Sequence, residues 1–312
     1  MPDRRLGRER GPYCKIISGL GGKDLVRTQR LAELYGRAGA DWFDVDLDPA
    51  VVAAARRGLK AAGAEQDCKI MVSCGLEGDP HVGAALLDAA VCATCPGCVI
   101  PELLACAQRP LELRAHECPS CAKCFAACPL GAIRVAAPLR LAATSLHECL
   151  AAGAVGVELH VAGAGLTEAK AAIAAMHAQL ADTVWLSLSL GAQVQSLEHV
   201  LALADAAARL GRSRWLLQVE GRPMHGQGAD SEALELAAAV LARRPDYPVQ
   251  LAGGTGLESA GRCRDRGLAV AGIAYGTTAR TLVAAGLADP ATAEQRERAL
   301  QAARALVASV RA

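Results

Sequence analysis

Eight short runs of β-branched and apolar residues alternate with longer Ala-rich segments along the 312 residues of this chain. The Ala-rich segments, such as DLVRTQRLAELYGRAGA and LEHVLALADAAARLG, place apolar residues three and four positions apart, which indicates amphipathic helices. Such alternation is typical of βαβ units around a parallel sheet, and eight units predict a closed (β/α)8 barrel of the TIM type. The expected strands cover residues 14–20, 42–47, 69–74, 155–161, 184–190, 215–221, 249–254 and 270–276.

The interval between the third and fourth expected strands breaks this rhythm. It holds about eighty residues, with a cluster of cysteines first and one expected helix, PLRLAATSLHECLAAGA, after it. Loops longer than about 15 residues usually carry a function. We therefore expect a two-cluster ferredoxin-like domain inserted after strand three. The expected division is 1–75 for the first part of the barrel, 76–136 for the insert and 137–312 for the remainder of the barrel.

The cysteine run CPSCAKCFAACP carries the strongest chemical signal. Its spacing, C-x2-C-x2-C-x3-C-P, is that of a bacterial 4Fe-4S ferredoxin. The alternative is a zinc knuckle or thiols without a ligand, but zinc sites more often pair two C-x2-C hooks across a longer gap. The run therefore predicts iron-sulfur ligands at Cys118, Cys121, Cys124 and Cys128.

A second run upstream, CATCPGC, repeats the first two gaps, and its fourth cysteine follows after seven residues instead of three. In two-cluster ferredoxins the fourth cysteine of each run ligates the other cluster. No proline directly follows Cys106, so a cluster held by three thiols, of the 3Fe-4S type, remains open as an alternative. The predicted ligand sets are Cys92, Cys95, Cys98 and Cys128 for one 4Fe-4S cluster, and Cys118, Cys121, Cys124 and Cys106 for the other.

Five further cysteines lie outside these runs, and we interpret them mostly as small buried hydrophobic residues. Cys74 is the exception, because it ends strand three and should therefore lie next to the insert. The five are Cys14, Cys68, Cys74, Cys149 and Cys263.

Alternate residues in each strand should face the surrounding helices, and here they are apolar. The residues that should face the barrel axis are polar, whereas a purely structural barrel fills its interior with branched apolar side chains. Ionised groups away from water are costly, so this polarity predicts a ligand or chemistry inside the barrel. The outward set is Phe43, Val45, Leu47, Ile70, Val72, Val157, Leu159, Leu186, Leu188, Leu217 and Val219, and the inward set is Asp44, Asp46, Lys69, Ser73, Glu158, His160, Ser187, Ser189, Gln218, Glu220 and Gln250.

Several charged residues should lie at the carboxyl ends of the strands, where the catalysts of (β/α)8 enzymes lie. Paired carboxylates near a histidine could shuttle protons, but the same groups could equally satisfy one another in a buried ion network. The candidate catalytic residues are Glu158, His160, Glu220, Arg222 and His225, joined by Asp44 and Asp46 from strand two and Lys15 from strand one.

The last two strands end in LAGGTG and AYGTTAR. In (β/α)8 enzymes the loops after these strands form the common phosphate site. The alternative is a pair of glycine turns with a surface arginine. Flavin mononucleotide is the natural ligand to expect, because a flavin converts the one-electron steps of clusters into two-electron chemistry. The candidate cofactor-binding residues are Gly253, Gly254, Gly276, Thr277, Thr278 and Arg280.

The charge balance, 33 basic against 32 acidic residues, creates no field of one sign that would attract nucleic acid. No stretch approaches the roughly 18 apolar residues of a membrane-spanning helix, and the first residues lack the apolar core of a signal peptide. We therefore expect a cytoplasmic protein that neither binds nucleic acid nor spans a membrane.

The chain also resembles a known family, the light-dependent period (LdpA) proteins. The resemblance runs from about residue 13 to 285 and rests on CKIISGLGGKDLVRTQRLAELYGRAGADWFDVDLDPAVVAAA, the ferredoxin run, VEGRPMHGQG, and the pair VQLAGGTG and GIAYGTTAR. It implies an iron-sulfur protein in the redox input of a bacterial circadian clock, whose partners are a redox partner protein or the quinone pool, and clock-input proteins. It also places a family-typical acidic residue at Glu220.

Two main hypotheses about function follow from these observations. The first is a redox-sensing or electron-transfer protein in which two 4Fe-4S clusters are coupled to a ligand-binding barrel. The second is a cluster- and flavin-dependent oxidoreductase that acts on a small substrate at the barrel mouth. A barrel that serves only as a scaffold for a ferredoxin would leave the ionised interior unexplained.

Overall fold

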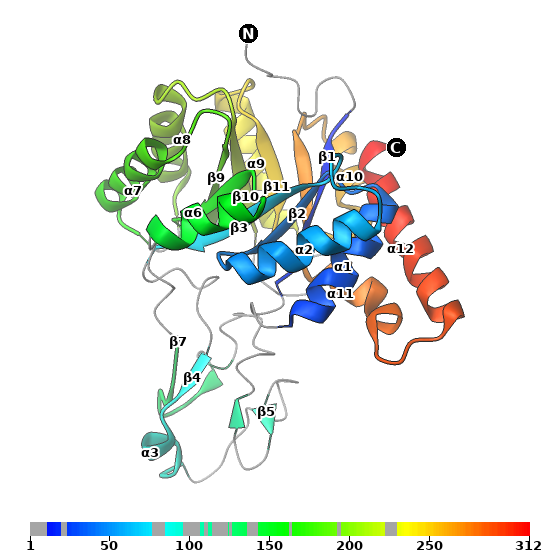
Figure 1. The fold of residues 1–312 in the computed structure, drawn as a ribbon. Helices are drawn as coiled ribbons and strands as arrows, with labels where there is room; N and C mark the ends of the chain where they lie inside the picture. Colours follow the sequence, from blue (N-terminus) through cyan, green and yellow to red (C-terminus); the bar gives the residue numbers. More distant parts are fainter. Residues whose placement is uncertain are drawn as a thin grey trace.

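Eight parallel strands close into a barrel in which the first strand pairs with the last (Figure 1). The predicted (β/α)8 architecture is therefore confirmed. The computed structural model describes residues 11–19, 24–76, 85–95, 107–108, 112–113, 124, 127–135, 143–161, 164–191, 195–221 and 230–312. The barrel strands, in their order around the ring, are β1 (Tyr13–Ile17), β2 (Trp42–Asp46), β3 (Lys69–Gly75), β8 (Gly156–His160), β9 (Trp185–Gly191), β10 (Trp215–Glu220), β11 (Val249–Ala252) and β12 (Gly272–Tyr275).

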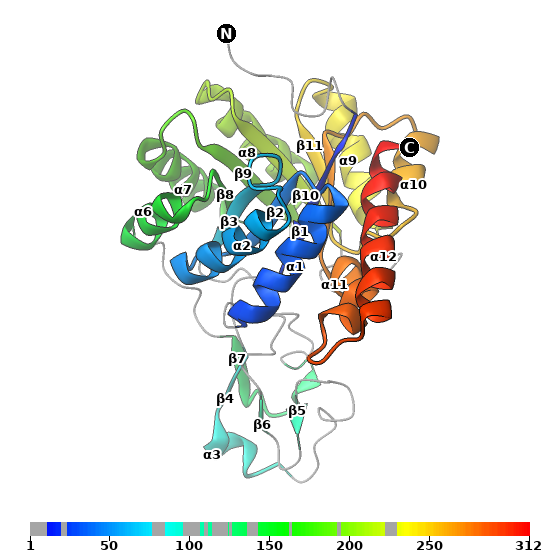
Figure 2. The ribbon, with the colours of Figure 1, turned by 45° about the vertical axis from the view of Figure 1, so that its right-hand side comes forward.

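Helices follow the barrel strands and cover the outside of the ring (Figures 1 and 2). Local signals mark where they begin. The Asp48 side chain accepts a hydrogen bond from the backbone N–H of Ala50, and a proline occupies the first turn of the same helix, α2. The helices of the barrel are α1 (Leu25–Ala38), α2 (Pro49–Ala61), α6 (Ala143–Ala152), α7 (Leu166–Gln179), α8 (Leu197–Arg209), α9 (Ser231–Arg243), α10 (Ser259–Asp265), α11 (Thr277–Val283) and α12 (Ala293–Arg311), with a 3-10 turn, η2 (Ala284–Leu287), before the last.

The predicted facing of the strand residues is also confirmed. Every residue of the outward set lies in the large hydrophobic core between strands and helices. At the amino-terminal end of the barrel, the interior is closed by a separate apolar cluster of Tyr13, Trp42, Met71, Trp185 and Leu216. Within this cluster the rings of Trp42 and Trp185 meet edge to face at 5.9 Å.

Two glycines leave space for side chains of this apolar cluster. A Cβ on Gly272 would lie 2.3 Å from the ring of Tyr13, and one on Gly156 would lie 2.9 Å from the Met71 methyl group. Only a residue without a side chain fits beside the aromatic groups at these two places. The floor of the barrel is therefore tightly packed with apolar side chains, and the Lys69 ammonium group lies against it, 5.5 Å from the centre of the Trp42 ring.

Additional elements lie between β3 and α6, where the sequence predicts the insert. Both ribbon views place them below the barrel, on the side opposite to the end of α12 (Figures 1 and 2). They are β4 (Ala85–Leu87), which pairs antiparallel with β7 (Ile133–Val135), α3 (Ala89–Cys92), and the pair β5 (Ala107–Gln108) and β6 (Glu112–Leu113). Of residues 77–142, the structure describes 85–95, 107–108, 112–113, 124 and 127–135, so the ferredoxin-like character of the insert stays a prediction.

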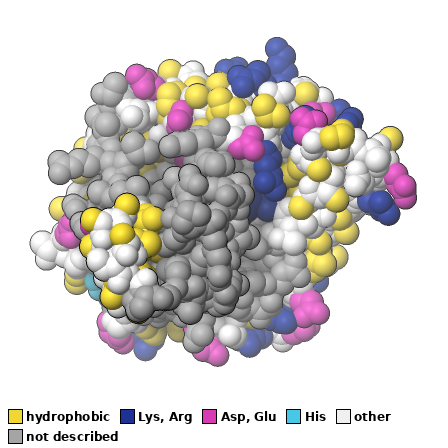
Figure 3. All heavy atoms as spheres, turned by 90° about the horizontal axis from the view of Figure 1, so that it is seen from below, with side chains coloured by type: hydrophobic (Ala, Val, Ile, Leu, Met, Phe, Trp, Pro, Cys, Tyr) yellow, Lys and Arg dark blue, Asp and Glu magenta, His cyan; other side chains and the backbone are white. Residues whose placement is uncertain are grey.

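The end of α12 is attached to the amino-terminal end of the barrel. Arg311 donates to the carbonyl oxygen of Gly39 and to the carboxylate of Asp41, which in turn accepts from the backbone N–H of Cys14. Seen from the insert side, the described basic and acidic side chains are interspersed around the rim (Figure 3). Of the helices that the structure describes, none combines the length and the apolar character needed to cross a membrane.

Candidate functional site at the barrel mouth

A lysine ion-paired to two carboxylates occupies the middle of the barrel. Lys15 on β1 is fully buried, and its Nζ lies 2.7 Å from Asp44 Oδ2 on β2 and 2.5 Å from Glu158 Oε2 on β8. Two serines bind the same carboxylates. Ser73 donates to Asp44 Oδ1 at 2.6 Å, and Ser187 donates to Glu158 Oε2 at 2.8 Å. The structure thus brings Asp44 and Glu158 of the predicted inward set together with Lys15, the candidate from strand one.

The environment assigns different protonation states to these three groups. Burial lowers the pKa of Lys15, but the charges of Asp44 and Glu158 outweigh it, so the pKa lies above its ordinary value. Burial also raises the pKa of Glu158, but Lys15 and then His160 hold it well below its usual range. For Asp44, burial outweighs the attraction of Lys15 and raises the pKa to about 6. Lys15 and Glu158 are therefore ionised, and Asp44 is the group that titrates closest to neutrality.

The amide of Gln218 on β10 connects the lysine to the mouth. Its Oε1 accepts from Lys15 Nζ at 3.2 Å and from the amide of Gln250, and its Nε2 donates to Glu158 Oε1 at 2.8 Å and to Glu220 Oε1 at 2.7 Å. The orientation of the amide follows from these charges, because its carbonyl faces the ammonium group and its amine faces the two carboxylates. The sequence predicts that Gln218 faces inward but does not identify it as a site residue.

Glu158, His160 and Glu220 form a group at the mouth end of the barrel. His160 Nε2 lies 3.4 Å from Glu158 Oε1. One potential ligand atom from each of the three side chains lies within 4.8 Å of the others, and this is the only such group of His, Cys, Asp and Glu among the described residues. His160 and Glu220 are 8% and 6% exposed, so the group is sheltered but close to the opening.

Three other predicted residues lie apart from this network or outside the described chain. Asp46 ends β2, where burial and then the charge of Asp48 raise its pKa. Arg222 and His225 lie outside the described residues, so their predicted place at the mouth stays a prediction.

The residues of the predicted phosphate site lie after β11 and β12, in the turns that follow these strands and in α11. Gly253 and Gly254 have φ of 73° and 74°, the left-handed region that favours glycine, and Gly276 precedes α11. A Cβ on Gly253 would lie 2.7 Å from the backbone nitrogen of Gly221, so close backbone packing alone already requires glycine there.

The polar side chains of this predicted site bind the protein itself in the structure. Thr278 donates to the carbonyl oxygen of Thr255 at 2.5 Å. Arg280 donates to the carbonyl oxygen of Ile17 at 3.1 Å and to Thr277 Oγ1 at 3.2 Å, and burial lowers its pKa to about 10. A phosphate at these loops would be bound mainly by backbone N–H groups and the exposed Thr277.

Half of the predicted cluster ligands are described. The backbone turns tightly at the described part of each run. The N–H of Cys95 donates to the carbonyl oxygen of Cys92 at 3.1 Å, and the N–H of Cys128 donates to the carbonyl oxygen of Cys124 at 3.0 Å. Desolvation raises the pKa of the Cys128 thiol, but hydrogen bonds from the backbone N–H groups of residues 130–133 outweigh it and lower the pKa. The remaining four ligands, Cys98, Cys106, Cys118 and Cys121, lie outside the described residues.

The five other cysteines are buried in the structure, as predicted. Cys74 belongs to the outward-facing core and lies 3.5 Å from the carbonyl oxygen of Glu158, and burial raises its pKa to about 12. It is therefore a protonated core thiol rather than a nucleophile or a ligand to the insert.

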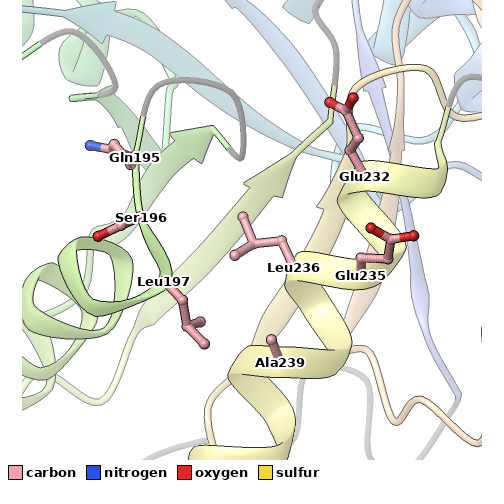
Figure 4. Close-up of a pocket in the computed structure, with 7 residues that line it drawn as sticks. All are labelled: Gln195, Ser196, Leu197, Glu232, Glu235, Leu236 and Ala239. Atoms are coloured by element: carbon pink, nitrogen blue, oxygen red, sulfur yellow. The ribbon is translucent and has the colours of Figure 1, made fainter.

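A surface groove between the start of α8 and α9 lies apart from this site (Figure 4). None of the inward-facing barrel residues lines it. Its walls carry Ser196 and Leu197 on one side and Glu232, Glu235, Leu236 and Ala239 on the other, with Gln195 at its edge.

Comparison with known proteins gives two kinds of similarity. A family described as "Light dependent period A C-terminal domain" matches residues 150–312. A protein of Synechococcus elongatus, "Light dependent period A", is 30% identical over 309 residues, which cover 92% of this chain and 85% of that protein. Among solved structures, the tryptophan synthase alpha chain of Legionella pneumophila subsp. pneumophila is 12% identical over 100% of this chain and 96% of that one, with a TM-score of 0.51, which shows the barrel fold alone.

Proposed function

Because the chain belongs to the light dependent period A family, we propose that it is an iron-sulfur redox protein in which two 4Fe-4S clusters are coupled to a ligand-binding barrel. In this role it acts as a redox sensor or electron-transfer component of circadian clock input. It exchanges electrons with a redox partner protein or the quinone pool and signals to clock-input proteins. When bound, the clusters supply one-electron chemistry at potentials set by their surroundings.

The observation that carries the proposal is the ferredoxin spacing of the cysteine run that ends at Cys128, and the backbone around Cys128 agrees with it. A metal ligand must be a thiolate, and hydrogen bonds from backbone N–H groups to sulfur are a common feature of cluster sites. Cys128 has a lowered pKa for this reason, and it is followed by Pro129 in the ferredoxin spacing. The buried cysteines of the barrel have raised pKa values instead. The residues of the insert that are described therefore fit a thiolate-ligated cluster.

A direct path connects the insert to the barrel site. The insert leaves the barrel after β3, where the N–H of Leu76 donates to the carbonyl oxygen of His160 at 3.1 Å. In the same strand, Ser73 pairs in register with Glu158 and donates to Asp44. Through β3, the insert and the groups around Lys15 are therefore joined by one continuous strand.

Iron and sulfide analysis of anaerobically purified protein tests the proposal. We expect about eight iron atoms per chain, visible absorbance that dithionite bleaches, and loss of iron in Cys128→Ala. The matched control is Cys149→Ala, which removes a buried core thiol outside both runs and should keep the iron. A colourless anaerobic preparation that contains zinc would exclude the proposal, and about four iron atoms would reduce it to one cubane.

The second candidate function is a cluster- and flavin-dependent oxidoreductase. It is favoured by the buried Lys15, Glu158 and His160 inside the barrel, because ionisable groups in a sheltered interior can transfer protons. Flavin mononucleotide or another phosphate-bearing ligand would then lie against Gly253, Gly254 and Gly276. Acid release followed by absorbance and mass analysis tests for the ligand, and turnover with an artificial electron donor tests for catalysis. Protein that releases no flavin and gives no turnover would exclude this alternative.

A further inference from the structure

We propose that Glu158, His160 and Glu220 bind a divalent first-row metal ion at the mouth of the barrel. This inference goes beyond the proposed function, because it concerns a mononuclear site in the barrel and does not depend on clusters in the insert. It rests on the geometry of the three side chains and on the hydrogen bonds that hold them.

The geometry fits a metal. One donor atom from each residue lies within 4.8 Å of the other two. With metal-ligand bonds of about 2.0–2.2 Å, two donors on opposite sides of an ion lie up to about 4.4 Å apart. Only small rotations of the side chains would therefore be needed to place all three around one ion. One imidazole and two carboxylates suit Mn²⁺, Fe²⁺ or Zn²⁺, with water in the remaining positions.

The surroundings hold the carboxylates as in a typical metal centre, where ligands are oriented by hydrogen bonds from neighbouring groups. Lys15 and Ser187 both bind Glu158 Oε2, which leaves Oε1 directed towards His160. Gln218 donates to both Glu158 Oε1 and Glu220 Oε1 and so fixes the separation of the two carboxylates. These partners come from three different strands, so the site is built into the barrel wall.

A separate observation points to a ligand in the same interior. Gln250 on β11 is fully buried beside Gln218, and its Oε1 has no hydrogen-bond partner among the described atoms. An unsatisfied buried acceptor costs about 1–3 kcal/mol. A water molecule bound to the metal would supply the missing donor. The competing interpretation is that His160 is itself the cation and forms a simple ion pair with Glu158.

Mn²⁺ binding to the full-length, anaerobically purified protein separates the two interpretations. Mn²⁺ prefers oxygen and nitrogen ligands, so the cysteines of the insert should not capture it. We expect about one Mn²⁺ per chain by equilibrium dialysis, and affinity weakened about tenfold or more in Glu220→Gln and His160→Gln. The matched control is Glu235→Gln, which makes the same change at an exposed position in the groove of Figure 4 and should bind as the parent chain does.

A second measurement keeps the test valid if a variant is less stable. Saturating Mn²⁺ should raise the thermal midpoint of the parent chain and of Glu235→Gln, and should not raise that of Glu220→Gln. Equal Mn²⁺ binding in all four proteins, or none in the parent chain, would overturn the inference. Iron and sulfide are measured on the same samples. Protein that lacks clusters but binds Mn²⁺ through Glu220 would exclude the proposed function and retain the metal site.

Discussion

Lys15 is enclosed completely by the barrel, yet its ammonium group has four neighbours that can stabilise a charge. These are the carboxylates of Asp44 and Glu158, the carbonyl oxygen of Gln218 and, at 3.6 Å, the sulfur of Met71. Removing one member of such a network leaves another charge buried without compensation, which is more costly than the loss of a surface ion pair. The network therefore fixes the relative positions of β1, β2, β8 and β10.

The first prediction concerns the pH dependence of stability. The pKa of Asp44 is about 6 in the folded protein against an ordinary 3.8, so the folded state binds more protons between these values. Stability should therefore fall as the pH rises from about 4 to 6. Asp44→Asn removes this contribution, and its free energy of unfolding should depend less on pH in that window. Urea unfolding at several pH values between about 5 and 6 measures the slopes in the upper part of this window, where Glu158, whose pKa is lowered, contributes little pH dependence. Equal slopes in both proteins would contradict the assignment.

At this scale the sequence predicts which side chains face the axis but not how they bind one another. Alternation along a strand places Glu158 and Gln218 inside the barrel. The contact between them depends on the stagger of β8 and β10 around the closed ring, which no local pattern specifies. For that reason the bridging role of Gln218 could not be predicted, whereas the inward facing of Asp44, Glu158, Gln218 and Glu220 could.

Among the elements, the ends of the strands show where local conformation outweighs the apolar pattern. The sequence predicts a strand to residue 254, but β11 ends at Ala252 because Gly253 and Gly254 take up positive φ. Likewise β12 ends at Tyr275, because Gly276 is the residue that precedes α11. The existence and order of the strands follow from hydrophobic spacing, whereas their last residues follow from backbone geometry.

The second prediction tests the floor of the barrel. Gly272→Ala would place a methyl group 2.3 Å from the Tyr13 ring, so we expect it to lower the free energy of unfolding by about 1–3 kcal/mol. The cost should shrink in a Tyr13→Ala background, since the colliding ring is then absent. Gly165→Ala is the control, because its Cβ would meet nothing within 4 Å and its φ is −66°. Chemical denaturation of the four variants and the parent chain gives the comparison. A full cost in both backgrounds would mean that Tyr13 is not the cause.

For the whole molecule, the barrel is closed without any strand from the insert. β3 pairs directly with β8 along five residue pairs, from Met71 with Gly156 to Gly75 with His160. The cysteine spacing predicts the presence and position of an insert, but not its fold, because metal ligands replace the hydrophobic pattern from which helices and strands are predicted.

The third prediction follows from this independence. Replacement of residues 77–142 by a Gly/Ser linker of about eight residues should leave a folded barrel, because β3 and α6 would be joined by an ordinary βα loop. Circular dichroism and a cooperative thermal transition measure the outcome, and the shortened chain should contain no iron. A shortened chain that is soluble but lacks a cooperative transition would show that the insert is needed for the barrel to fold.

The hydrogen bonds of Arg311 with Gly39 and Asp41 hold the end of α12 at the amino-terminal end of the barrel. The beginning of β1 and the end of α12 both lie at the closed floor, opposite the insert (Figures 1 and 2). A surface or electrode that captures the protein through an affinity tag after Ala312 would hold it with the insert pointing into solution. If the insert holds the proposed clusters, soluble mediators would exchange electrons with such a film readily, whereas direct current between the electrode and the protein would be slow.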